Sequence, residues 1–326
     1  MMNYEVDICL ATYNGDKYLP DLIRSIQNQS FKDWCLLVSD DGSIDSTLDI
    51  LNEYFNRDSR ILPILEGVFF HNATDHFLAI LKQSHSSYAM FCDQDDVWLE
   101  DKIETSLKSM HDLEDRYGPD VPLLVFSDST VVNEKLEVIR SSNASGFMFD
   151  PNAISLSRLI ISNVAQGCTI LMNRAARKLI NSIERPSSFD YHDHWAAASV
   201  MAAGHIYFLD RSTVLYRQHG SNVVGADFNS SYFHMLLNGL HKIFERGSFQ
   251  KMFSDETRFC RRAQDLLALD IVSDPEKRKA LRRLSVFNSL PLGESIRVIR
   301  QEGLIKMTSP YGKVCQLIGI FGSRWF

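Results

Sequence analysis

Three aspartates that follow one apolar run have the type and spacing of a cation site. The run 88–92 (YAMFC) is followed by Asp93, Asp95 and Asp96. Carboxylates two residues apart at the end of a strand can point toward one position beyond the sheet, and hard divalent cations such as Mg²⁺ and Mn²⁺ bind oxygen ligands. Taken alone, an Asp-x-Asp pair is more often an acidic turn, here with Asp96 as the N-cap of the following helix.

Tyr13 and Asp41 follow two other apolar runs and could together hold a nucleobase. Tyr13 comes after the run 6–11 (VDICLA), and Asp41 comes after the run 34–39 (WCLLVS). An aromatic ring can stack on a base, and a carboxylate can accept a hydrogen bond from a ring N–H. Each residue alone is a weak signal, because an Asp-Gly pair is usually a turn and a Tyr after a strand usually packs.

A third group of candidates lies in the segments 191–195 (YHDHW) and 216–222 (YRQHGSN). Asp193 stands at the predicted start of a helix, where an Asp is either a cap or a general base. The histidines on either side of it do not have the spacing of a zinc site and are predicted to be packed or solvated. For His219, a metal ligand and a buried hydrogen-bonding side chain remain equally open.

The elements that must position these residues alternate between two periodicities. Short apolar runs predict strands, and the stretches between them carry apolar residues at helical spacing, such as Leu19, Leu22 and Ile26. This order predicts an α/β fold with a mainly parallel sheet and helices on both faces, in which ligands collect at the carboxyl ends of the strands. The predicted strands cover residues 6–11, 34–39, 60–65, 88–92 and 123–127, the third at an edge because of Pro63 and the last ending at Asp128.

Three runs, taken in order, resemble a known family. ICLATYNGDKYLPDLIRSIQNQSF, LLVSDDGSIDST and YAMFCDQDDVWLEDKI are similar to the family 2 inverting glycosyltransferases of the GT-A fold, in particular the rhamnosyltransferase-like branch that builds bacterial surface polysaccharides. The resemblance covers roughly residues 5–225 and is strongest in the first hundred. It implies a GT-A α/β fold with a mainly parallel central sheet and flanking helices.

The resemblance also implies roles for individual residues. Asp193 matches the catalytic base, and Asp95 is implied to bind the metal directly while Asp93 faces the ribose or the metal-bound waters. The basic nucleotide contact of the family has no clear counterpart in residues 67–72 (GVFFHN), where Asn72 takes its place. The implied nucleotide-sugar contacts are Ala11, Thr12, Tyr13, Asp41, Asn72 and Asp93, and the implied metal ligands are Asp95, Asp93 and His219. Trp98 is expected to pack beneath the metal loop.

These residue types suit an inverting sugar transfer. A carboxylate such as Asp193 can take the proton of an attacking hydroxyl, and a divalent cation can neutralise a leaving diphosphate. The prediction is a glycosyltransferase that uses Mn²⁺ or Mg²⁺ and transfers a sugar, by resemblance rhamnose, from a UDP- or dTDP-linked donor to a glycan or a lipid-linked acceptor. The alternatives are a nucleotidyltransferase, which would normally need a Gly-rich triphosphate loop, and a non-catalytic nucleotide-sugar or glycan-binding partner in an assembly complex.

Composition and pattern together predict two domains. The chain has 326 residues, 45% apolar and 23% charged, which excludes disorder and collagen-like repeats. After strand-like runs at 205–209 and 214–217 the sequence becomes helical and basic. We therefore predict a catalytic domain over residues 1–226 and a C-terminal helical segment over residues 227–326.

Charge is distributed unevenly along the chain. Residues 242–326 hold 16 Lys and Arg against 9 Asp and Glu, whereas the residues before them hold 18 against 32. An acidic catalytic domain predicts that nucleic acid is not a partner. The basic segment is either a solvated helical face or a peripheral contact with an anionic membrane.

Three features bear on the cellular compartment. The six cysteines show no C-x-x-C pairing and are predicted to be buried thiols of a reducing compartment. The first residues lack the basic start and apolar stretch of a signal peptide. The most apolar stretch, residues 195–209, is shorter than the roughly 20 residues that span a membrane. We predict a cytoplasmic protein, with any membrane contact peripheral and at the inner face.

Overall fold

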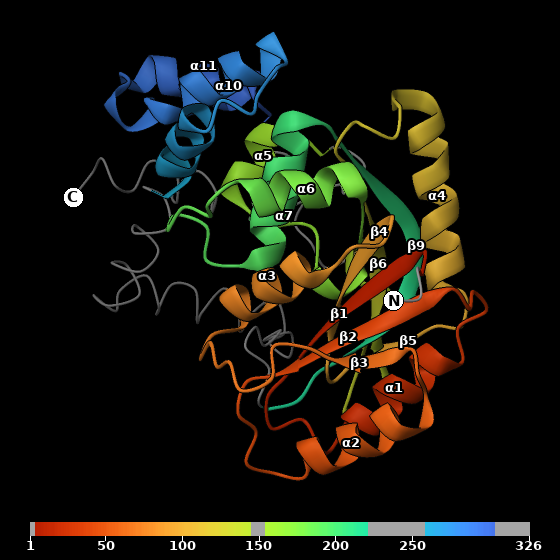
Figure 1. The fold of residues 1–326 in the computed structure, drawn as a ribbon. Helices are drawn as coiled ribbons and strands as arrows, with labels where there is room; N and C mark the ends of the chain where they lie inside the picture. The colour runs from red at the N-terminus through yellow and green to blue at the C-terminus, as the bar shows by residue number, and fades with distance from the viewer. Residues whose placement is uncertain (1–3, 145–153, 221–257, 304–326) are drawn as a thin grey trace. The chain divides into compact units, whose positions relative to one another are not determined.

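The computed structural model describes residues 4–144, 154–220 and 258–303 (Figure 1). It divides into two compact units, and each unit is discontinuous in sequence. The first unit comprises Met1–Gly146 and Asn163–Arg217, and the second comprises Phe147–Ser162 and Gln218–Phe326. The predicted domain boundary between residues 226 and 227 falls outside the described residues and stays a prediction.

One mixed sheet forms the centre of the first unit. Its strands follow the order β3-β2-β1-β4-β8-β6-β9-β5, and β7 pairs with β6 beside this path. The strands are β1 (Val6–Thr12), β2 (Trp34–Asp40), β3 (Ile61–Pro63), β4 (Tyr88–Asp93), β5 (Val97–Trp98), β6 (Leu123–Val132), β7 (Val138–Arg140), β8 (Ile170–Asn173) and β9 (His205–Arg217).

The parallel part of the sheet brings the predicted site residues to one edge. β1 lies between β2 and β4, and the last residue of β1, Thr12, is paired with Asp40 of β2. One residue earlier, Ala11 is paired with Asp93 of β4. The carboxyl ends of the three strands therefore lie side by side. β3, with Pro63, lies at the edge of the sheet as predicted.

Helices cover both faces of this sheet (Figure 1). Ile8 and Leu10 of β1 belong to a core that also includes Leu22 of α1 and Ile103 of α4. On the opposite face Phe91 of β4 packs edge to face on a ring of α3. The helices of the first unit are α1 (Leu19–Gln27), α2 (Thr47–Arg57), α3 (Ala73–Gln83), α4 (Lys102–Tyr117), α6 (Arg174–Ser182) and α7 (His192–Ala203). The predicted α/β architecture with a mainly parallel sheet is thus confirmed, with antiparallel pairing at β8, β5 and β7.

Two predicted strand boundaries were wrong. β6 does not end at Asp128 but continues to Val132, with a register shift against β9 at this point. The runs 205–209 and 214–217 are one strand, β9, which pairs in parallel with almost the whole of β6. In both cases polar residues that looked like loop lie inside a long strand because its neighbour continues alongside.

The second unit is helical where it is described. α5 contacts α10, and Arg262 Nη1 donates a hydrogen bond to the carbonyl oxygen of Ile160 at 3.0 Å. Its helices include α5 (Leu156–Ile161), α10 (Pro275–Ser285) and α11 (Leu292–Gln301). Among the described residues of the chain, no helix has both the length and the apolar character needed to cross a membrane.

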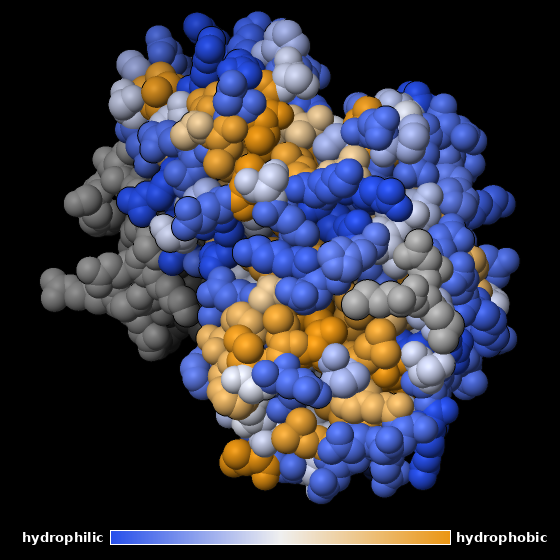
Figure 2. All heavy atoms as spheres, viewed as in Figure 1, coloured by the Kyte–Doolittle hydropathy of each residue, from blue (hydrophilic) through white to orange (hydrophobic). Residues whose placement is uncertain are grey.

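Apolar side chains are found both on the surface and in the interior, and the cysteines lie in the interior. Figure 2 shows a mostly hydrophilic face, with an apolar area over the region of β1 to β3. Apolar side chains that remain exposed near this part of the chain include Leu62, Val68 and Phe69. The cysteines of the described residues are buried and free, namely Cys9, Cys35, Cys92, Cys168 and Cys260.

Candidate functional site

The acidic loop between β4 and β5 holds three carboxylates that differ in exposure. Asp93 ends β4 and is partly exposed, as is Asp95. Asp96 is fully buried, and its Oδ1 accepts a hydrogen bond from the backbone N–H of Arg217 at 3.0 Å. The interpretation of Asp96 as a helix cap was wrong, because α4 begins at Lys102.

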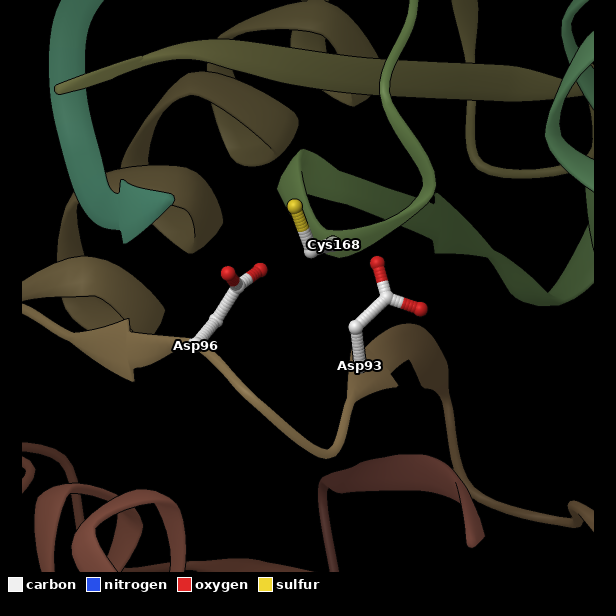
Figure 3. A group of neighbouring side chains, drawn as sticks. All are labelled: Asp93, Asp96 and Cys168. Atoms are coloured by element: carbon white, nitrogen blue, oxygen red, sulfur yellow. The ribbon is translucent and has the colours of Figure 1, made fainter. Parts of the chain in front are cut away.

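Asp93, Asp96 and Cys168 lie close together (Figure 3), and their ligand atoms lie within 4.8 Å of each other. Burial and the charge of Asp95 raise the pKa of Asp93, and the same two causes raise the pKa of Asp96. One oxygen of Asp96, Oδ2, is buried with no hydrogen-bond partner. The two carboxylates offer the oxygen ligands that a hard divalent cation binds, and its charge would relieve their repulsion, whereas the Cys168 thiol is not a ligand that such a cation prefers.

A buried lysine lies next to this group. Lys102 is fully buried, and its Nζ lies 4.7 Å from the centre of the Trp98 ring. Burial lowers the pKa of Lys102 to about 8, although the nearby Asp96 carboxyl opposes the shift. Trp98 itself is buried in β5, directly after the acidic loop, as predicted.

The predicted nucleobase residues lie at the ends of β1 and β2. Thr12 is buried, and its Oγ1 donates to Asp40 Oδ2 at 2.8 Å. Asp41 is 8% exposed and accepts a hydrogen bond from the backbone N–H of Phe70. Tyr13 is 56% exposed, so its ring is available to a ligand. A nucleobase contact by Tyr13 and Asp41 stays a prediction.

Gln94 joins the nucleobase residues to the acidic loop. Its Oε1 accepts from the backbone N–H of Tyr13 and its Nε2 donates to the carbonyl oxygen of Tyr13, both at 2.9 Å. A Cβ atom on Gly15 would lie 2.3 Å from Gln94 Oε1, so a glycine leaves room for this bridge. Sequence reasoning missed Gln94, since it stood only as the variable residue of the Asp-x-Asp pattern.

Asp193 lies in the first turn of α7 and is held by backbone groups. Its Oδ2 accepts from the N–H of Gly167 at 3.1 Å, and its Oδ1 accepts from the N–H of His194 at 2.6 Å. Burial raises its pKa to about 6, and its charge in turn raises the pKa of Asp93. Tyr191, not Asp193, is the N-cap of α7. The structure therefore brings Asp193 and Asp93 close enough to interact.

The two neighbouring histidines are packed. His192 stacks on Phe77 with ring centres 4.1 Å apart, and burial lowers its pKa to about 3. His194 is buried against Phe189.

Three other candidates have structural partners or lie elsewhere. Asn72 is the N-cap of α3 and accepts from the N–H of Asp75 at 2.8 Å. Asp128 accepts from the N–H of Ala144 at 2.8 Å within the first unit. His219 belongs to the second unit. A nucleotide contact by Asn72 and metal binding by His219 stay predictions.

The chain is similar to known proteins in both sequence and structure. Residues 7–152 match the family described as Glycosyl transferase family 2. The dTDP-rhamnosyl transferase RfbG of Shigella flexneri is 26% identical over 230 residues, which cover 68% of this chain and 75% of the relative. The Escherichia coli glucosyltransferase WfgD, named for transfer from UDP-Glc to alpha-D-GlcNAc-diphosphoundecaprenol, is 27% identical over 189 residues, 57% of this chain and 66% of the relative.

Two solved structures share the fold at low sequence identity. TarS from S. aureus has a TM-score of 0.51 at 16% identity, over 98% of this chain and 54% of that chain. The mannosyltransferase PcManGT from Pyrobaculum calidifontis, in complex with GDP-Man and Mn²⁺, has a TM-score of 0.51 at 12% identity, over 100% of this chain and 82% of that chain.

Proposed function

Since the chain belongs to the family 2 glycosyltransferases and has their GT-A fold, we propose that it transfers a sugar, with inversion, from a pyrimidine nucleoside-diphosphate sugar to a hydroxyl of a glycan or lipid-linked acceptor. The observation that carries this proposal is the edge formed by the ends of β1, β2 and β4. At this edge Gln94 ties Tyr13 to the acidic loop, and the charge of Asp193 acts on Asp93 by raising its pKa.

The acidic loop fits a divalent cation and a diphosphate. Asp95 would hold Mn²⁺ or Mg²⁺, while Asp93 would face the ribose or the waters of the ion. The bound ion supplies positive charge that neutralises the leaving nucleoside diphosphate. Asp96 supports the loop from inside, since its Oδ1 accepts from the Arg217 N–H.

Asp193 is proposed as the general base. The acceptor oxygen forms a bond to the anomeric carbon, the bond from that carbon to the diphosphate oxygen breaks with its electron pair, and the acceptor proton passes to Asp193. A pKa of about 6 leaves this carboxylate ionised at neutral pH and still basic enough to accept a proton. The N–H groups of Gly167 and His194 fix its orientation.

The loop after β1 disfavours a nucleotidyltransferase. A triphosphate loop uses free backbone N–H groups to bind phosphates. Here the N–H of Asn14 donates to Ser43 Oγ and that of Gly15 donates to Thr47 Oγ1, both at 2.8 Å. These groups are already occupied by side chains of the chain itself.

The donor and the cellular site are narrower proposals. The name of RfbG makes dTDP-rhamnose the first donor to test, with a UDP-sugar as the alternative. A lipid-linked acceptor would place the enzyme at the inner face of the membrane, with the basic helix α10 as a candidate contact.

The test is a thermal-shift panel of UDP, dTDP, GDP and ADP, each with Mn²⁺ or with a chelator. A ligand at 100 times its Kd stabilises a fold by about 2.7 kcal/mol, so binding is easily measured. We expect a Mn²⁺-dependent response to UDP or dTDP in wild type that is lost in Asp95→Asn. Asp120→Asn, which changes an exposed carboxylate outside the site, is the matched control. No response of wild type to any of the nucleotides would overturn the proposal.

A further inference from the structure

Arg217 is a buried cation at the end of β9, next to the acidic loop. It is the last residue of that strand and is 3% exposed. Burying a guanidinium is costly unless its N–H groups are satisfied. The hydrogen-bond partners of Arg217 therefore indicate its role.

Two hydrogen bonds connect Arg217 to consecutive residues of the acidic loop. Its backbone N–H donates to Asp96 Oδ1 at 3.0 Å, and its Nε donates to the carbonyl oxygen of Asp95 at 2.8 Å. The first bond holds the inward-pointing carboxylate. The second holds the backbone of Asp95, whose side chain is partly exposed. The loop is therefore fixed at two consecutive residues.

The remaining donors of the guanidinium anchor it to two other segments. Nη1 donates to the carbonyl oxygen of Glu134 at 2.9 Å, and Nη2 forms an ion pair with Asp21 Oδ2 at 3.1 Å. The guanidinium carbon also lies 4.5 Å from the centre of the Tyr18 ring. α1, the turn after β6 and the acidic loop thus meet at one side chain.

This set of contacts requires an arginine. A guanidinium is planar and offers five N–H donors in a rigid fork, whereas a lysine ammonium is a single point with a flexible stem. A buried charge that is satisfied largely by carbonyl oxygens adds little to stability compared with an apolar side chain. Its distinctive effect is to hold the loop backbone in one geometry.

We propose that Arg217 is a positioning residue that sets the orientation of the Asp95 carboxylate toward the divalent cation and the donor diphosphate. The inference rests on the proposed function, since it assigns the support of that same cation site. Arg217 acts through the Asp95 backbone and does not touch the substrate. Residues that orient a metal ligand in this way typically contribute about 10- to 100-fold to metal affinity.

The experiment measures the Kd for Mn²⁺ in the presence of UDP or dTDP, at a temperature where every variant is folded. We expect Arg217→Lys to weaken Mn²⁺ binding by about tenfold or more. The matched control is Arg60→Lys, because Arg60 also stacks on an aromatic ring, at 3.8 Å from Trp34, and pairs with a carboxylate, Asp58. It should lose a similar amount of thermal stability and keep its Mn²⁺ affinity within twofold.

The outcomes separate the inference from the proposed function. If wild type binds no Mn²⁺ with either nucleotide, the proposed function fails and the inference fails with it. If wild type binds and Arg217→Lys binds equally well, only the inference is overturned. Should Arg217→Lys not fold, Asp21→Ala decides, since it removes the carboxylate that accepts from Arg217 Nη2. Weaker Mn²⁺ binding by that variant supports the inference, and unchanged binding overturns it.

Discussion

Asp193 combines burial with two backbone hydrogen bonds, and this combination defines its chemistry. Burial raises its pKa to about 6, while the N–H groups of Gly167 and His194 oppose the shift. A carboxylate in this range loses its proton below neutral pH but remains a useful base. The same N–H groups fix the orientation of the side chain.

Asp193→Asn is expected to lower kcat by about 10²- to 10⁴-fold and to leave the KM for the donor nearly unchanged, because only proton transfer is lost. In wild type the ionised form is active, so kcat should fall as pH drops through about 6 and stay level above it. Steady-state kinetics from pH 5 to 8 measure both effects.

Asp190→Asn is the matched control, since Asp190 is exposed and three residues away. Its kcat and pH profile should match those of wild type. An Asp193→Asn variant with the kcat of wild type would remove the assignment of the base.

Gln94→Leu is expected to weaken nucleotide binding without loss of metal ligands. It removes two hydrogen bonds to Tyr13, and a typical hydrogen bond contributes about 1 kcal/mol. We expect the Kd for UDP or dTDP to rise by about 5- to 30-fold, measured by calorimetry. Gln94→Glu keeps the acceptor for the Tyr13 N–H, so its Kd should lie between those of wild type and Gln94→Leu. Equal Kd values for all three would show that the bridge is not used.

The sequence predicted the residues at the ends of strands better than the residues that link one element to another. The placement of Tyr13, Asp41 and Asp93 at one edge could be predicted because parallel strands bring their carboxyl ends together there. Gln94 and Arg217 could not, because their roles depend on distances across the sheet that a linear pattern does not contain. The Arg at the end of the run 214–217 (VLYR) was the one available signal.

Among the elements, the parallel pair of β6 and β9 depends on one close backbone contact. Its register starts at Leu123 and His205, and the N–H of His205 donates to the carbonyl oxygen of Pro122 at 3.0 Å. A Cβ on the preceding residue, Gly204, would lie 1.9 Å from that same oxygen. Only a glycine lets β9 begin here.

Gly204→Ala is therefore expected to destabilise the first unit by about 3 kcal/mol or more, since backbone atoms cannot yield as a flexible side chain can. Urea unfolding followed by circular dichroism measures this loss. Gly293→Ala is the control, because nothing lies within 4 Å of its added Cβ. A variant at Gly204 with the stability of wild type would mean that β9 can shift without cost.

The elements themselves were predictable where the pattern was local. The strands at 6–12, 34–40 and 88–93 are short apolar runs between turns, and the structure confirms them. The continuous β9 was not predictable, because Asp210 to Thr213 read as a polar loop. The antiparallel placement of β8 was also missed, since pairing direction depends on the path of the chain through space.

For the molecule as a whole, one segment of the second unit is inserted into the sequence of the first. Phe147–Ser162 belongs to the second unit although the chain before and after it belongs to the first. α5, within this segment, buries Leu159 and Ile160 completely and contacts α10. The composition shift near residue 227 did not indicate that this earlier segment belongs to the second unit.

A fragment that ends at Arg217 is expected to associate or aggregate, because α5 would keep its apolar side chains but lose α10. Size-exclusion chromatography and binding of an apolar dye measure this. Replacing residues 147–162 by a Gly/Ser linker in the same fragment should restore a monodisperse species. A fragment of residues 1–217 that behaves like the linker variant would contradict this division into units.

The same insertion determines the order in which α5 and its partner helix are synthesised. α5 leaves the ribosome more than a hundred residues before α10, a wait of roughly 6 to 20 s at usual elongation rates. Throughout that interval α5 lacks its contact with α10. Nascent chains of this protein are therefore expected to bind a holding chaperone at α5 until α10 has been synthesised.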